Sequence, residues 1–148
     1  MQYQEKRGIL YIISNAVVST LYFLYVLMVA QPSLPQRLDD KTNWAIVILA
    51  YILLLIVVRI VVVIIFAIVH KIQTNEDTVE IEDELDKLID LKATRIFYGF
   101  FMAGLILSIG SQAIGWPLWV LFAGIGATIA VSGLIGDLVQ LIYYRRGV

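Results

Sequence analysis

Two ionisable residues, Arg59 and Asp137, lie inside long apolar stretches of the sequence. A charged side chain at the centre of a bilayer costs roughly 2.5–3.5 kcal/mol on insertion scales, so such a residue is usually paired or functional. At the rise of an α-helix, Arg59 lies about 15 Å from Val69, where its apolar stretch ends. Asp137 lies about 12 Å from Arg145 by the same conversion. Because these depths are similar, we expect the two residues to form an ion pair between helices.

Asn15 is a third polar residue within an apolar stretch, and it lies about 10 Å in from Gly8 at helical rise. It extends the pair into a polar layer. Such a layer fits two interpretations: an ion- or proton-coupled site or polar pocket, or a structural lock that fixes which helix faces which. A lone pair without a second carboxylate is thin evidence for transport, so we favour the lock.

Helices that cross a membrane must position these side chains. The chain has 148 residues, of which 60% are hydrophobic and 16% charged, against roughly 45–50% apolar residues in soluble domains. A bilayer core about 30 Å thick needs about 20 helical residues per crossing. Four apolar segments have about that length or more, at residues 8–30, 44–69, 96–114 and 118–143. We therefore predict an all-α membrane protein with four transmembrane helices in one domain, surrounded by the lipid bilayer.

Lysine and arginine residues are unevenly distributed around these four segments. Eight lie in the N-terminal tail, in the connection between the second and third segments, and in the C-terminal tail, whereas two lie in the first connection. Because cytoplasmic loops carry the excess of positive charge, this asymmetry predicts cytoplasmic N- and C-termini. Trp44, Trp116 and Trp119 then fall near the outer interface, where aromatic residues are enriched.

The connection between the second and third segments is strongly acidic. Ile81, Leu85, Leu88 and Ile89 recur within it at helical spacing, which predicts a cytoplasmic amphipathic helix over residues 77–92. No Gly or Pro prevents this helix from running into the third segment. Its acidic face either is simply solvated, the commoner case, or docks a basic protein partner. The candidate docking residues are Glu80, Glu82, Asp83, Glu84 and Asp86.

Small residues recur every four positions in the last two segments. The fourth segment contributes Gly124, Thr128, Ser132 and Gly136, and the third contributes Gly104 and Ser108. Such stripes let helix backbones approach closely within a membrane. The short link between these segments favours packing of one segment on the other, and a homodimer face is the alternative.

The sequence lacks the residues of most common active sites. It has no Cys and a single His, His70, which excludes disulfides, thiolate metal sites and a metal site built from histidines alone. It has no Ser–His–Asp grouping, no HExxH and no glycine-rich phosphate loop. It is also not basic enough to indicate nucleic-acid binding. We therefore expect no catalytic residue, no metal, no cofactor and no nucleic-acid partner.

Residues 83–93, with the sequence DELDKLIDLKA, lead into Arg95 and Tyr98. This segment resembles the signature of a family of small prokaryotic four-span membrane proteins, in which an acidic D-E-R-D stretch and a Lys-Ala step precede the third span. Leu85 stands where that signature has Arg. The resemblance implies a prokaryotic cytoplasmic (inner) membrane protein of accessory or regulatory type, from a family whose members accompany small DNA-binding regulators.

The exposed acidic segment and the missing catalytic groups predict a non-enzymatic integral membrane protein of accessory, regulatory or immunity type. It would act through a membrane or cytoplasmic partner. The alternative is a small dimeric transporter or channel with a polar path around Asn15, Arg59 and Asp137.

Overall fold

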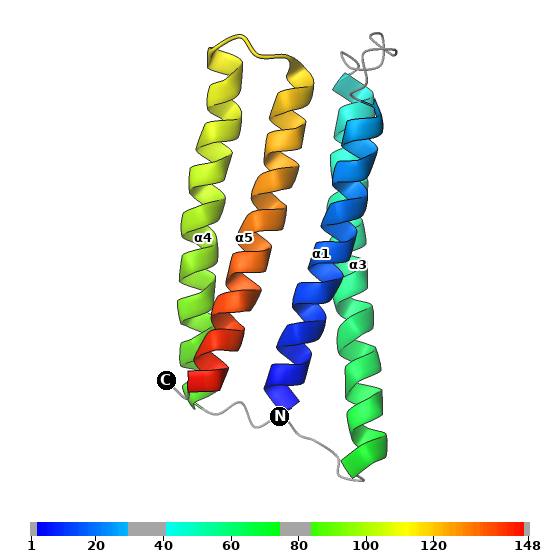
Figure 1. Ribbon diagram of the computed structural model, residues 1–148, viewed down its shortest axis with the longest axis vertical. Helices are drawn as coiled ribbons and strands as arrows, with labels where there is room; N and C mark the ends of the chain where they lie inside the picture. Colours follow the sequence, from blue (N-terminus) through cyan, green and yellow to red (C-terminus); the bar gives the residue numbers. More distant parts are fainter. Residues whose placement is uncertain (1–2, 30–40, 75–83, 147–148) are drawn as a thin grey trace.

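The computed structural model describes residues 3–29, 41–74 and 84–146. These residues form four helices and no strand: α1 (Tyr3–Val29), α3 (Lys41–Thr74), α4 (Glu84–Ala113) and α5 (Leu118–Arg146) (Figure 1). Each helix contains a stretch long and apolar enough to cross a membrane, at Glu5–Met28, Asn43–Val69, Glu84–Ala113 and Leu118–Arg146. The prediction of an all-helical chain with four candidate spans is therefore confirmed.

Helix α4 begins much earlier than the third apolar segment predicted from the sequence. It starts at Glu84 and continues without a break to Ala113, so residues 84–92 are its first turns and not a separate helix. The absence of Gly and Pro around this point explains the continuity, since these residues end or kink helices. The remainder of the predicted amphipathic helix, residues 77–83, lies outside the described residues.

A tight turn joins α4 to α5. Gly115 has a φ of 80°, a left-handed conformation that glycine adopts at little cost. The Trp116 N–H donates to the Ser111 carbonyl and the Gly115 N–H to the Gln112 carbonyl, both at 3.1 Å. This is the Schellman pattern of helix ends, followed by Pro117, which cannot continue the helix. The turn therefore makes α4 and α5 an antiparallel hairpin.

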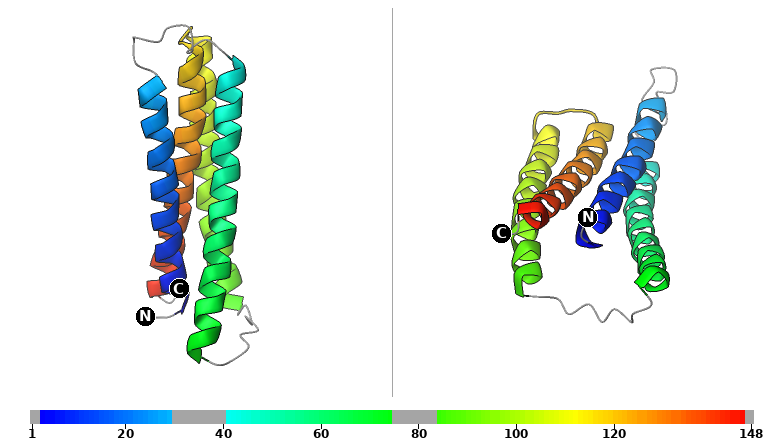
Figure 2. Two further views of the ribbon diagram at one scale, coloured as in Figure 1. Left: turned by 90° about the vertical axis from the view of Figure 1, so that its right-hand side faces the viewer. Right: turned by 60° about the horizontal axis from the view of Figure 1, so that its bottom comes forward.

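The four helices run alongside one another, and α5 has neighbours on both sides (Figure 1). It packs most extensively on α4 and next on α1, whereas α3 contacts α1 and, more sparingly, α5. The starts of α1 and α4 and the ends of α3 and α5 lie at one end of the molecule (Figures 1 and 2). Helix α3 is the least buried, since no residue of its most apolar stretch is buried.

The main apolar cluster lies between α1 and α3, towards the end away from the termini. Its buried members are Val18, Tyr22, Val26, Trp44 and Tyr51. The Tyr22 and Tyr51 rings stack with centroids 4.3 Å apart, and the Tyr22 hydroxyl donates to the Phe122 carbonyl of α5 at 3.0 Å. Aromatic packing and one hydrogen bond therefore hold α1, α3 and α5 together in this half.

Candidate functional site

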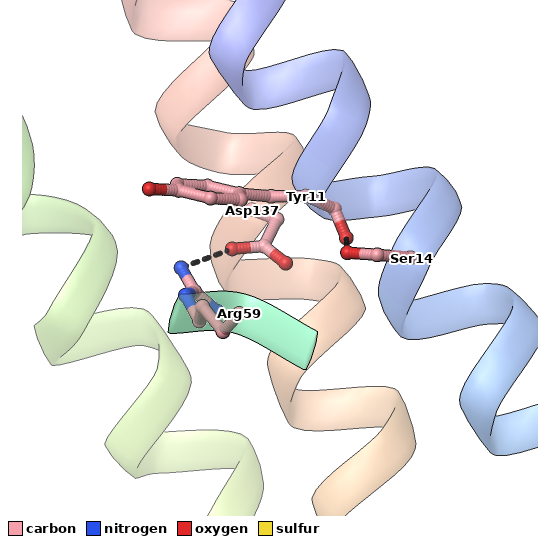
Figure 3. Close-up of polar contacts among 4 residues, drawn as sticks. All are labelled: Tyr11, Ser14, Arg59 and Asp137. Carbon is pink, nitrogen blue, oxygen red and sulfur yellow. Dashed lines mark hydrogen bonds and ion pairs between the residues drawn. The ribbon is translucent and has the colours of Figure 1, made fainter. Parts of the chain in front are cut away.

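Arg59 of α3 and Asp137 of α5 form an ion pair, with Arg59 Nη2 3.0 Å from Asp137 Oδ1. The guanidinium carbon of Arg59 also lies 4.4 Å from the centroid of the Tyr11 ring, a distance at which a cation is attracted to the face of an aromatic ring. Figure 3 shows Tyr11 reaching from α1 over this pair. The pair therefore connects three helices, two of which are otherwise in sparse contact.

The two partners differ greatly in exposure. The side chain of Asp137 is 5% exposed, whereas that of Arg59 is 51% exposed. The second carboxylate oxygen, Oδ2, is buried and has no hydrogen-bond partner among the described residues. A buried acceptor left without a donor costs about 1–3 kcal/mol, and more when it is charged. The ion pair thus leaves one buried carboxylate oxygen without a hydrogen-bond donor and one guanidinium half-exposed.

Asn15 is the other polar neighbour of the Asp137 carboxylate. Its Oδ1 accepts a hydrogen bond from the Ser19 hydroxyl at 3.2 Å, and the Ser19 and Tyr51 hydroxyls are 2.9 Å apart. A polar chain thus runs from the ion pair along α1 and across to α3. The sequence reasoning included Asn15 but missed Ser19 and Tyr51.

The sequence of α1 contained a signal for these polar contacts. Tyr11, Asn15, Ser19 and Tyr22 follow one another at intervals of three or four residues, the spacing of one helix face. All four are buried in the structure. A stripe of residues with polar side-chain atoms on one face of a membrane helix therefore marked the face of α1 that packs against α3 and α5.

Tyr51→Phe should lower the free energy of unfolding by about 1 kcal/mol, the usual net contribution of one hydrogen bond. The substitution removes the hydroxyl that meets Ser19 and keeps the stacked ring. Tyr25→Phe is the matched control, because Tyr25 lies on α1 with 47% of its surface exposed. Unfolding by sodium dodecyl sulfate in mixed micelles, followed by circular dichroism, measures the free energy of unfolding of both variants. Equal losses in the two variants would contradict a role for the Ser19–Tyr51 contact.

Two cavities flank the ion pair. One has a volume of about 140 Å³ and is lined by residues from all four helices, including Tyr11, Ser14 and Asn15. The other has a volume of about 120 Å³ and lies between α3, α4 and α5. Arg59, Phe97 and Gly133 line both cavities. Space for small molecules therefore borders Arg59 in both cavities.

The predicted packing residues lie between α4 and α5. A Cβ added at Gly124 would be 2.7 Å from the Ser108 hydroxyl, and one at Gly104 would contact Thr128. Ser132 is buried, and Gly136 faces Phe97 of α4. A second face of α5 meets α1: a Cβ at Gly133 would be 2.6 Å from the Asn15 amide nitrogen. Helix α5 therefore uses small residues on two faces.

The acidic docking candidates are only partly within the described residues. Glu80, Glu82 and Asp83 lie outside them, whereas Glu84 and Asp86 are in the first turn of α4. Both Glu84 and Asp86 have interaction partners, and Asp86 is a hydrogen-bonding neighbour of Tyr144 in α5.

Other contacts at the same end of the molecule also connect helices. Glu5 and Arg145 form an ion pair of 3.5 Å between α1 and α5, and the Lys92 ammonium lies 5.2 Å from the centre of the Tyr143 ring. Part of the charge here therefore stabilises the chain itself.

Fold and site together define the class of this chain: an all-helical protein with four candidate membrane-spanning helices and an ion pair between two of them. Within the described ranges, no group of three or more His, Cys, Asp or Glu residues could hold a metal ion. No family model, no curated protein and no solved structure matches the chain.

Proposed function

We propose that the chain is a non-enzymatic accessory or regulatory protein of a prokaryotic cytoplasmic membrane, with both termini in the cytoplasm. It acts by binding a transmembrane segment of a partner protein along α3, beside Arg59. The half-exposed Arg59 side chain carries this proposal. The excess of Lys and Arg around the helix ends that lie with the termini supports the orientation.

The hydrogen-bonding capacity of Arg59 is largely unused. A guanidinium has five N–H donors, and among the described residues Arg59 makes one hydrogen bond, to Asp137. Its neighbours on the exposed side of α3, Ile56 and Val63, are apolar and face outwards. In hydrocarbon an N–H without an acceptor is costly. A partner helix that presents a carbonyl, amide or carboxylate oxygen at this depth would satisfy these donors.

Photo-crosslinking in native membranes tests this surface. Benzoylphenylalanine at Ile56 or Val63 should give an adduct with a membrane protein, and the crosslinked peptide should come from a transmembrane segment with a polar acceptor. Val57 and Val61 are the matched control positions, because they are also exposed and lie on the opposite side of the helix at about 100° per residue. They should give no such adduct.

Two further experiments make the result decisive. Arg59→Leu combined with Asp137→Leu removes the guanidinium without leaving an unpaired buried carboxylate, a replacement that is often tolerated. The adduct should disappear in this background. Two differently tagged copies of the chain distinguish a second copy from another protein. Adducts of equal yield from both sides of α3, or adducts that persist without Arg59, would overturn the proposal.

A further inference from the structure

Helix α4 leaves one side uncovered, because α5 is its one extensive neighbour among the described helices. Figure 1 shows α4 at the edge of the molecule, with α5 between it and α1. Exposed residues on this side recur every three or four positions, the spacing of one helix face. This outer face of α4 consists of Leu88, Lys92, Arg95, Gly99, Met102 and Ile106. Two cations therefore interrupt an otherwise apolar stripe.

Helical rise places these two cations at the level of lipid phosphates. The turn after Ala113 carries the exposed Trp116 and marks one membrane interface, where tryptophan is enriched. Counted from Ala113, Arg95 lies about 27 Å and Lys92 about 32 Å along α4. Because the hydrocarbon core is about 30 Å thick, the two cations flank its other boundary. The Cα–Cβ bonds of a helix tilt towards its N-terminus, which in α4 is the side of these headgroups.

Arg95 has no acidic partner among the residues that the structure describes. The positions three and four residues away on either side hold no carboxylate, and no ion pair or hydrogen bond joins Arg95 to a described residue. Arg59 and Arg145, in contrast, are both paired. The Lys92 ammonium lies over the Tyr143 ring, which holds its position without neutralising its charge. At this depth the phosphate of a lipid supplies the acceptors that the guanidinium needs.

The residues next to Arg95 on the outer face leave room for an acyl chain. A Cβ added at Gly99 would have nothing within 4 Å, so the backbone is bare one turn further into the membrane. Phe100 and Met102 flank this position on either side, with 51% and 53% of their surfaces exposed. The outer face therefore offers cations for a phosphate and, beside them, an apolar notch for the chain attached to it.

We propose that the outer face of α4 binds an anionic phospholipid, with its phosphate against Arg95 and Lys92 and an acyl chain over Gly99. Two cations without a carboxylate between them favour a headgroup of net negative charge over a zwitterionic one, whose own cation they repel. This site lies on α4, apart from the partner surface proposed for α3, and neither depends on the other.

Native mass spectrometry of the detergent-purified chain, titrated with phosphatidylglycerol, tests the site. Phosphatidylcholine with the same acyl chains carries the phosphate without net charge and should bind more weakly. Glycerol 3-phosphate carries the anionic group without acyl chains and should not displace the lipid. Displacement by glycerol 3-phosphate would overturn the proposal in favour of a site for soluble phosphate, and equal binding of the two lipids would overturn the selection by charge.

Substitutions identify the cations that hold the lipid. Arg95→Gln should weaken phosphatidylglycerol binding by roughly fivefold, as expected for the loss of one cation near an anionic lipid, and adding Lys92→Gln should weaken it further. The Arg95 variant should keep the circular dichroism spectrum of the parent chain, because its side chain is exposed.

Lys87→Gln is the matched control for these variants. It removes the same charge from an exposed position of α4, but about 12 Å further along the helix from Ala113 than Arg95, so it should leave the affinity unchanged. Equal losses of affinity in the Arg95 and Lys87 variants would refute the site, because the overall charge alone would then attract the lipid.

Discussion

Arg59→Asp and Asp137→Arg should each lower the free energy of unfolding by about 3–5 kcal/mol, the loss typical of breaking a buried ion pair at one partner. Each single reversal places two like charges at the contact that now measures 3.0 Å. The double variant, with both reversals, restores opposite charges at the same place. It should recover most of the lost stability, and the double-mutant cycle should give a coupling free energy of about 1–3 kcal/mol.

The exposed pair between Glu5 and Arg145 provides the matched control. Its atoms are 3.5 Å apart, and its carboxylate is less buried, with 17% of the Glu5 side chain exposed against 5% of the Asp137 side chain. The same reversals at this pair should change stability by about 1 kcal/mol or less, because water screens an exposed ion pair. Titration with sodium dodecyl sulfate measures the free energy of unfolding of all six purified variants, three for each ion pair. Single-variant losses at Arg59 and Asp137 that merely add in the double variant would show that the two charges have separate partners.

Gly126→Ala should be strongly destabilising, costing about 1–3 kcal/mol as in other overpacked interiors. A Cβ at Gly126 would overlap the edge of the Tyr22 ring and lie 2.7 Å from its hydroxyl oxygen. That hydroxyl donates to the Phe122 carbonyl, so the ring cannot withdraw without losing a hydrogen bond. We expect α1 to separate from α5 at this point.

Gly99→Ala is the control for helix propensity. Nothing lies within 4 Å of a Cβ at Gly99, so the substitution should be neutral or should stabilise α4 by up to about 1 kcal/mol. Tyr22→Leu should partly rescue Gly126→Ala, because it removes the ring edge. Cysteine crosslinking between α1 and α5 reports separation directly. If the Gly126 and Gly99 variants were similarly stable, the Tyr22 ring would have to move freely out of the way of the added methyl group.

The coarse architecture was predictable because it depends on composition and length alone. Four apolar segments long enough to span a bilayer predict four helices, and helical rise is sufficient to place Arg59 and Asp137 at similar depths. The start of α4 at Glu84 was harder to predict, because hydropathy locates an apolar segment but not the first residue of the helix that contains it. A helix can extend beyond the membrane wherever polar residues with good helix propensity continue it.

The contacts of α1 could not be predicted in the same way. Periodicity reveals that Asn15, Ser19 and Tyr22 share a face, but not which helix that face meets. The meeting of Ser19 with Tyr51 depends on how far α3 is rotated and shifted relative to α1, and sequence spacing carries no information on either. The second small face of α5, which meets α1, was equally hidden, because Gly126 and Gly133 lie outside the four-residue stripe that begins at Gly124.

The wide separation of the ion pair along the chain has a consequence for biosynthesis. Arg59 and Asp137 are 78 residues apart, so at about 5–20 residues per second the ribosome needs about 4–16 s to make the second after the first. During that interval α3 holds a cation whose counter-charge does not yet exist. Arg59 must therefore be tolerated by the insertion machinery, or by lipid headgroups, until α5 is delivered. Delivery of α5 is then the event that fixes α3 in place.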